Sequence, residues 1–103
     1  MRDMMKMMKQ AKDLQKNMEA AQAQLAETMV TGTSGGNAVT VEMTCTHEIK
    51  AVKIDPAAVD ADDIETLEDL VQTAVADAIR KGQETSQTEM GKLTGGLNIP
   101  GLS

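Results

Sequence analysis

The chain has 103 residues and a net charge of −6, with nine methionines, one cysteine, one histidine and no aromatic residue. That length suits a single domain, and no apolar run reaches the roughly 18–20 residues that a membrane-spanning helix needs. One cysteine excludes an internal disulfide and, with no signal peptide, predicts a reducing cytoplasm, while one histidine argues against a metal site or metal cofactor. Because aromatic side chains bury the most area, their absence makes association with a second copy the expected way to complete a core.

The first predicted element is an amphipathic helix over residues 2–28. Written in sevens, its apolar residues recur at two positions three residues apart, which is the a/d pattern of packed helices. Met5 and Met8 widen this apolar stripe at the start of the helix. The residues expected to form the seam, within the core or against a second copy, are Met4, Met7, Leu14, Met18 and Leu25.

The same helix has a charge opposite to that of the remaining chain. Its first sixteen residues hold five basic and two acidic residues, a local charge of +3, so the remaining 87 residues carry −9. Arg2, Lys9 and Lys16 share the heptad position opposite the seam, and Lys6 and Lys12 lie close to them. Lysines on the surface of a helix most often only face solvent. In this helix, however, acids are sparse before Glu19, and a row of cations with few acids fits contacts with phosphate groups.

The absence of aromatic residues indicates which kind of phosphate-bearing ligand the basic residues would bind. Without Phe, Tyr or Trp no base can stack on an aromatic ring, which disfavours single strands and makes a duplex backbone the natural target. An anionic membrane is a weaker alternative, because the helix has no Trp or Phe to anchor it.

Alternating periodicity replaces the helical pattern after residue 28 and predicts strands at about 28–32, 38–46 and 49–54. In the third strand Val52 and Ile54 are expected to face inward, while Ile49 and Ala51 are out of phase and indicate a bulge or two covered faces. The second strand is half-buried, with one face made of Val39, Val41, Met43 and Cys45.

Glycines 32, 35 and 36 are interpreted as a hairpin turn between the first two strands. A phosphate-binding loop would need a following Lys-Ser/Thr and a helix after it, and neither is present.

Helical spacing returns over residues 61–93, with Asp60 as the expected N-cap. The acids at 60–65 resemble the start of a calcium loop, but Glu65 stands where that loop needs glycine, so helix capping is the better interpretation. The tail, 97–103, is rich in glycine and proline and predicted to be loosely ordered. The predicted order is therefore α-β-β-β-α, an α+β fold with a three-stranded antiparallel sheet and long terminal helices.

Catalytic residues are not evident. Cys45 and His47 lie two apart on a strand and share a face, but Cys45 continues an apolar face and is interpreted as a buried small hydrophobe. We therefore expect no enzyme.

Five stretches of the chain, in this order and spacing, resemble the YbaB/EbfC family of nucleoid-associated proteins: MMKQAKDLQKNMEAAQAQLAE, VTGTSGGNAVTV, VKIDP, LEDLVQTAVADAIRK and EMGKLTGGLNIPG. The resemblance covers nearly the whole chain and implies one domain over 1–96, a tight homodimer with projecting helices, and weakly selective DNA binding in the bacterial cytoplasm and nucleoid. It also implies phosphate contacts by Lys9, Lys12 and Lys16, with a second arm in the distal part of the last helix.

The sequence thus leads to one principal hypothesis, a non-catalytic homodimer that binds double-stranded DNA and influences nucleoid organisation and gene expression. The alternative is a protein-interaction scaffold dimer that docks its methionine-rich first helix in a partner's groove. The residues expected to contact DNA are Arg2, Lys6, Lys9, Lys12, Lys16, Arg80, Lys81 and Lys92.

Overall fold

A computed structural model describes residues 2–95 and shows the predicted α-β-β-β-α order. The strands form one antiparallel sheet in the order β1-β2-β3, which confirms the α+β fold. The predicted tail, 97–103, lies outside the described residues. The elements are helix α1 (Arg2–Leu25), strands β1 (Met29–Ser34), β2 (Val39–Thr44) and β3 (Ile49–Ile54), a 3-10 turn η1 (Pro56–Ala58) and helix α2 (Ile64–Gly95).

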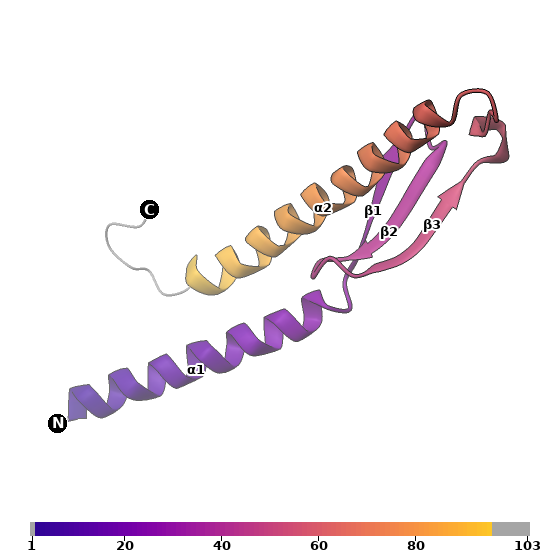
Figure 1. Ribbon diagram of the computed structural model, residues 1–103. Helices are drawn as coiled ribbons and strands as arrows, with labels where there is room; N and C mark the ends of the chain where they lie inside the picture. Colours follow the sequence, from indigo (N-terminus) through magenta and orange to yellow (C-terminus); the bar gives the residue numbers. More distant parts are fainter. Residues whose placement is uncertain (1, 96–103) are drawn as a thin grey trace.

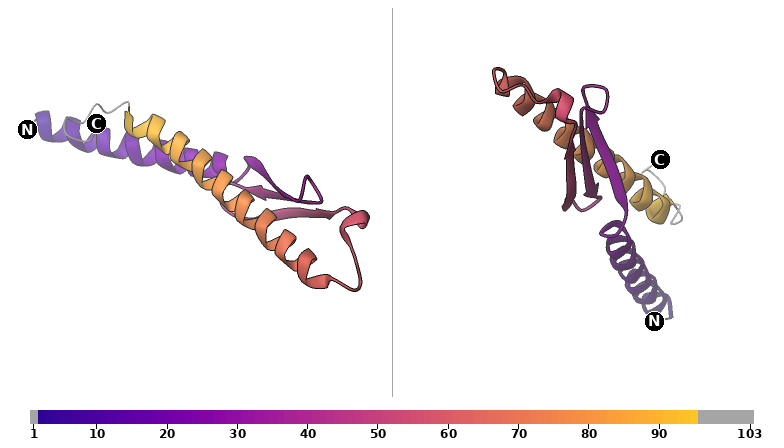
Figure 2. Two further views of the ribbon diagram at one scale, coloured as in Figure 1. Left: turned by 90° about the horizontal axis from the view of Figure 1, so that it is seen from above. Right: turned by 90° about the vertical axis from the view of Figure 1, so that its right-hand side faces the viewer.

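The molecule consists of a sheet–α2 body, residues 29–95, and an arm made of α1 (Figures 1 and 2). Helix α2 lies along one face of the sheet, and α1 extends away from the sheet on the side where α2 ends. The radius of gyration is 19.9 Å, whereas a compact domain of about 100 residues has one near 13 Å. The arm accounts for this elongation.

The core lies between α2 and the first two strands. Its buried members come from alternate positions of β2, as predicted, and from small residues of α2: Val39, Val41, Met43, Ala74 and Ala78. The helix can approach β1 closely because Gly32 has no side chain there. A Cβ atom on Gly32 would lie 2.2 Å from the Ala74 carbonyl oxygen and 2.4 Å from the Ala78 nitrogen, far inside van der Waals contact.

The inward-facing residues of strand β3 stay partly exposed. Val52 and Ile54 pair with the buried Val41 and Val39 and so lie on the face of the sheet that α2 covers. They are nevertheless 46% and 40% exposed, because α2 packs against β1 and β2 and stops short of β3. The inward orientation predicted for them is therefore confirmed, but a single chain does not bury them. The register shift between Glu42 and Met43 shows that a bulge explains the phase change in this strand.

The helix ends differ by a few residues from the predicted ones. Helix α1 ends at Leu25 rather than at residue 28. The Thr28 hydroxyl donates a hydrogen bond to the Gln24 carbonyl at 2.8 Å, and the Thr28 carbonyl accepts one from the Cys45 N–H, so Thr28 already belongs to the link with the sheet. Helix α2 begins at Ile64 rather than at 61 and continues to Gly95. Asp63 caps it by accepting bonds from the Thr66 N–H and hydroxyl.

The loops before α2 and between the strands explain the remaining shifts. Asp60, expected as the N-cap, instead accepts from the Asp62 N–H in the preceding turn. Strand β1 runs on to Ser34, whose hydroxyl donates to the Leu70 carbonyl of α2. The hairpin turn then takes Gly35, Gly36 and Asn37 through positive φ angles, as predicted. Gly32, also expected in the turn, lies within β1 and pairs with Val41. Strand β2 ends at Thr44, because the Thr44 hydroxyl and carbonyl close the next turn.

Candidate nucleic-acid interface

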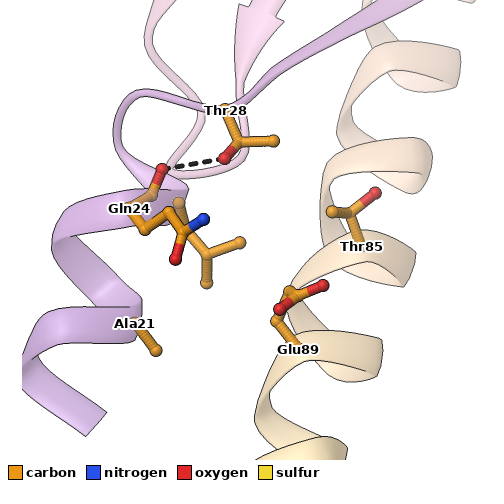
Figure 3. Close-up of a pocket in the computed structure, with 6 residues that line it drawn as sticks. Ala21, Gln24, Thr28, Thr85 and Glu89 are labelled. Carbon is orange, nitrogen blue, oxygen red and sulfur yellow. Dashed lines mark hydrogen bonds between the residues drawn. The ribbon is translucent and has the colours of Figure 1, made fainter. Parts of the chain in front are cut away.

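Helix α1 is held only where it joins the sheet–α2 body. Leu25 is 2% exposed, while residues 2–20 are exposed apart from a half-buried Leu14. The exposed seam residues include Met4, Met7 and Met18, at 70%, 68% and 41%, so a single chain leaves most of the seam uncovered. Near Leu25, a cleft of about 170 Å³ separates α1 from α2 (Figure 3); its walls are Ala21, Gln24, Leu25 and Thr28 on one side and Thr85 and Glu89 on the other.

The five cations of α1 form what we call the basic row: Arg2, Lys6, Lys9, Lys12 and Lys16. All five are exposed. Across residues 2–95, none of them takes part in an ion pair or a side-chain hydrogen bond. Asp13 stands four residues after Lys9 and three before Lys16, yet within the described residues it forms an ion pair with neither. The charge of the row is thus available to a ligand.

The three cations predicted on α2 are in a different state, because each is already paired with a carboxylate of the same helix. Arg80 donates to Asp77 at 2.7 Å and to Glu84 at 2.8 Å. Lys92 lies 3.2 Å from Glu89. Lys81 contacts Asp77 at 3.0 Å and also donates to the Thr31 carbonyl of β1 at 2.9 Å.

Asp77 is the centre of this network, and the sequence reasoning missed it. Its carboxylate accepts from the Thr33 backbone N–H at 3.0 Å as well as from both cations. These bonds, that of Thr33 first, hold the pKa of Asp77 well below its usual range, and pairing with Asp77 and Glu84 raises the pKa of Arg80. The spacing of Asp77 to Arg80 and Lys81, three and four residues, is the signal that could have found the network.

Acidic residues dominate the end of the molecule opposite the start of α1. Seven acids lie between residues 55 and 69, and no lysine or arginine occurs between Ile54 and Ile79. Figure 1 shows this segment, η1 and the beginning of α2, at the far end from the N-terminus. The two lysines of β3 are each paired as well, Lys50 with Glu48 at 3.0 Å and Lys53 with Glu42 at 3.6 Å. Within residues 2–95, the positive charge that has no acidic partner therefore lies on α1.

The residues considered for catalysis do not form a reactive pair. Cys45 is 4% exposed, and burial raises the pKa of its thiol, which lowers the fraction of the nucleophilic thiolate. His47 is exposed in the β2–β3 turn at a positive φ. Over the part of the chain that the structure describes, no three His, Cys, Asp or Glu side chains gather as a metal site, and neither helix is long and apolar enough to span a membrane.

Comparison with known proteins assigns the chain to a class of DNA-binding protein. Residues 1–97 match the sequence model of the YbaB/EbfC DNA-binding family. A nucleoid-associated protein of Afipia carboxidovorans is 50% identical over 102 residues, covering 99% of this chain and 97% of that protein. Another, from Alkaliphilus metalliredigens, is 46% identical over 97% of this chain and 88% of that protein.

The chain therefore belongs to the YbaB/EbfC DNA-binding family. The same fold occurs in the crystal structure of an uncharacterized protein from Helicobacter pylori, with a TM-score of 0.74 at 18% sequence identity, over 85% of this chain and 92% of that one.

Proposed function

We propose that this protein is a non-catalytic, nucleoid-associated homodimer in the bacterial cytoplasm that binds duplex DNA with little sequence preference. The observation that carries the proposal is the basic row of α1, five exposed cations that have no acidic partner within residues 2–95, on an arm that stands clear of the acidic remainder. Lysine and arginine contacts to phosphates release counterions and read no base, so affinity is broad. By organising DNA in this way the protein influences gene expression.

The α2 cations act second in this proposal. Arg80, Lys81 and Lys92 each have a carboxylate beside them that already compensates their charge. That compensation weakens their attraction for a phosphate, so we assign most of the binding to α1.

The homodimer is supported by apolar surface that one chain leaves uncovered. Ile49, Val52 and Ile54 of β3 are 49%, 46% and 40% exposed beside α2. A second copy that covers this surface and the α1 seam would supply the burial that a chain without aromatic residues lacks. Light scattering should then give twice the chain mass. Val52→Lys with Ile54→Lys should give monomers, whereas the control Val59→Lys, at an equally exposed loop position, should not.

The experiment that tests DNA binding is a titration of a labelled random-sequence duplex at about 50 and 200 mM salt. Six or more phosphate contacts predict a loss of at least ~10³ in affinity over that range. Absence of binding at the lower salt would refute the proposal. It would favour the scaffold alternative, in which the exposed methionines of α1 dock in a partner's groove with little dependence on salt.

A further inference from the structure

Two exposed methionines of α1 belong neither to the seam nor to the sheet–α2 body. Met5 and Met8 are 72% and 60% exposed, and neither stands at a seam position. Single exposed apolar side chains are common on protein surfaces. An apolar side chain inside a charged ligand-binding face, with a second at the border of that face, is less usual and suggests contact with an apolar part of the ligand.

Helical spacing places both methionines among the cations. Met5 comes three residues after Arg2 and four before Lys9, so it shares their face. Viewed down the helix axis, it falls between Lys12 and Lys16. Met8 lies one turn before Lys12 and borders the basic row on the side nearer the seam. A surface that contacts phosphates through this row therefore also brings two thioether side chains against the DNA.

We propose that α1 enters the major groove and that Met5 and Met8 contact the C5-methyl groups of thymine while the basic row contacts the flanking phosphates. This inference rests on the proposed function and names the groove and the chemical group that the arm recognises. The major groove, about 12 Å wide, admits an α-helix, and the thymine methyl is the apolar group displayed there. The basic row, from Arg2 to Lys16, extends about 21 Å at the helical rise and can reach both walls of the groove.

Methionine suits such a contact because it is unbranched and flexible. Its thioether can adapt to methyl groups at different positions along the groove. The contact therefore favours thymine-rich DNA in general, without selecting one sequence, and is compatible with weakly selective binding.

The test compares two duplexes that differ in that methyl group alone. One is an A·T-rich duplex of about 25 base pairs, and the other has uracil in place of every thymine. Burial of one methyl group is worth about a fourfold change in affinity, so the full-length protein should bind the thymine duplex at least about fourfold more tightly. In a G·C duplex, 5-methylcytosine presents the same methyl group and should raise affinity by a similar factor.

Variants locate the effect on the helix. Met5→Gln with Met8→Gln keeps a good helix former and removes the apolar contact, so the ratio of the thymine to the uracil affinity should fall to about one. Met5→Leu with Met8→Leu should keep the ratio. The matched control, Met4→Gln with Met7→Gln, changes two methionines of the seam and should also keep it.

The inference and the proposed function fail in different ways. Salt-dependent binding with equal affinity for thymine and uracil duplexes would overturn the methyl contact and leave duplex binding in place. If Met4→Gln with Met7→Gln lowered the ratio of the thymine to the uracil affinity equally, the methyl contact would also be overturned, since the effect would then come from the helix as a whole. No binding to any duplex would refute the proposed function itself. Binding of α1 to anionic phospholipid vesicles, without a thymine effect on DNA, would assign Met5 and Met8 to a membrane surface.

Discussion

Helix α1 carries five cations and α2 carries three, and the two helices leave them in opposite states. The basic row of α1 has no acidic partner among residues 2–95, whereas Arg80, Lys81 and Lys92 of α2 each have one within 3.2 Å. Opposite charges three or four residues apart occur on both helices, as Asp13 does beside Lys9 and Lys16, but within residues 2–95 they form ion pairs on α2 alone. The charge that a helix offers a ligand thus depends on which ion pairs form and is not given by its count of lysines and arginines.

The contrast between the two helices holds only while α2 stays packed on the sheet. This packing depends on Gly32, where the helix approaches β1 closely. Gly32→Val should abolish cooperative unfolding, because its side chain would occupy space filled by the α2 backbone at Ala74 and Ala78. Thermal denaturation followed by circular dichroism measures the effect. The control Gly91→Ala, where a Cβ meets nothing within 4 Å, should be neutral or stabilise by up to about 1 kcal/mol. A normally folded Gly32→Val protein would contradict the close approach.

The direct test of the comparison reverses charge on one helix and neutralises it on the other. Lys9→Glu with Lys16→Glu should weaken binding about 100-fold or more near 50 mM salt and flatten its salt dependence, because phosphate contacts are lost in both copies of a dimer. The loss should be similar on unrelated duplexes. Arg80→Gln with Lys92→Gln, at paired cations, should cost less than about threefold. Fluorescence anisotropy gives both values, and equal losses would remove the distinction between the helices.

Asp77→Asn should make α2 resemble α1 by releasing Lys81 from its carboxylate and leaving Arg80 paired with Glu84 alone. DNA affinity should rise a few-fold, about two to five. The melting temperature should fall, because the bond that α2 accepts from the Thr33 N–H is no longer strengthened by a negative charge. The pKa of Asp77 is lower in the folded protein than in the unfolded chain, and this sets how its contribution to stability depends on pH. That contribution is complete above the pKa of the unfolded chain and is lost as the pH falls through the pKa of the folded protein. The difference in melting temperature between wild type and Asp77→Asn should therefore be constant above about pH 5 and shrink below about pH 4. A difference that grows on acidification would contradict this assignment.

The smallest effect concerns the acid that interrupts the basic row. Asp13→Asn removes a negative charge beside Lys9 and Lys16 without breaking an ion pair of the described chain. Binding at about 50 mM salt should tighten roughly twofold, and the gain should shrink as salt screens the charge. Glu19→Gln, beyond the basic row, is the matched control and should change less.

The sequence was sufficient where local pattern alone decides structure. Alternation in β2 predicted the buried face of Val39, Val41 and Met43, and the glycines before it predicted the turn. The start of α2 was harder, because Asp60 and Asp63 are equally good caps by type and only the path of the chain selects Asp63.

Placement between elements could not be predicted. Val52 and Ile54 have the right phase for a buried face, but their exposure depends on how far α2 reaches across the sheet. The α2 cations were named as available charges although the spacing to Asp77, Glu84 and Glu89 already signalled pairing. The residues of the candidate site remain predictions that DNA measurements must test.

The bonds that α2 makes to β1 also bear on aggregation. A strand at the rim of a sheet presents unpaired N–H and C=O groups that can recruit further strands, which is the route to fibrils. Here the outward Thr33 N–H is taken by Asp77 and the outward Thr31 carbonyl by Lys81. Growth by strand addition is therefore hindered along β1 and left open along β3. In sheets that join through β3, the remaining rims are the hindered β1 strands, so propagation beyond a pair is disfavoured.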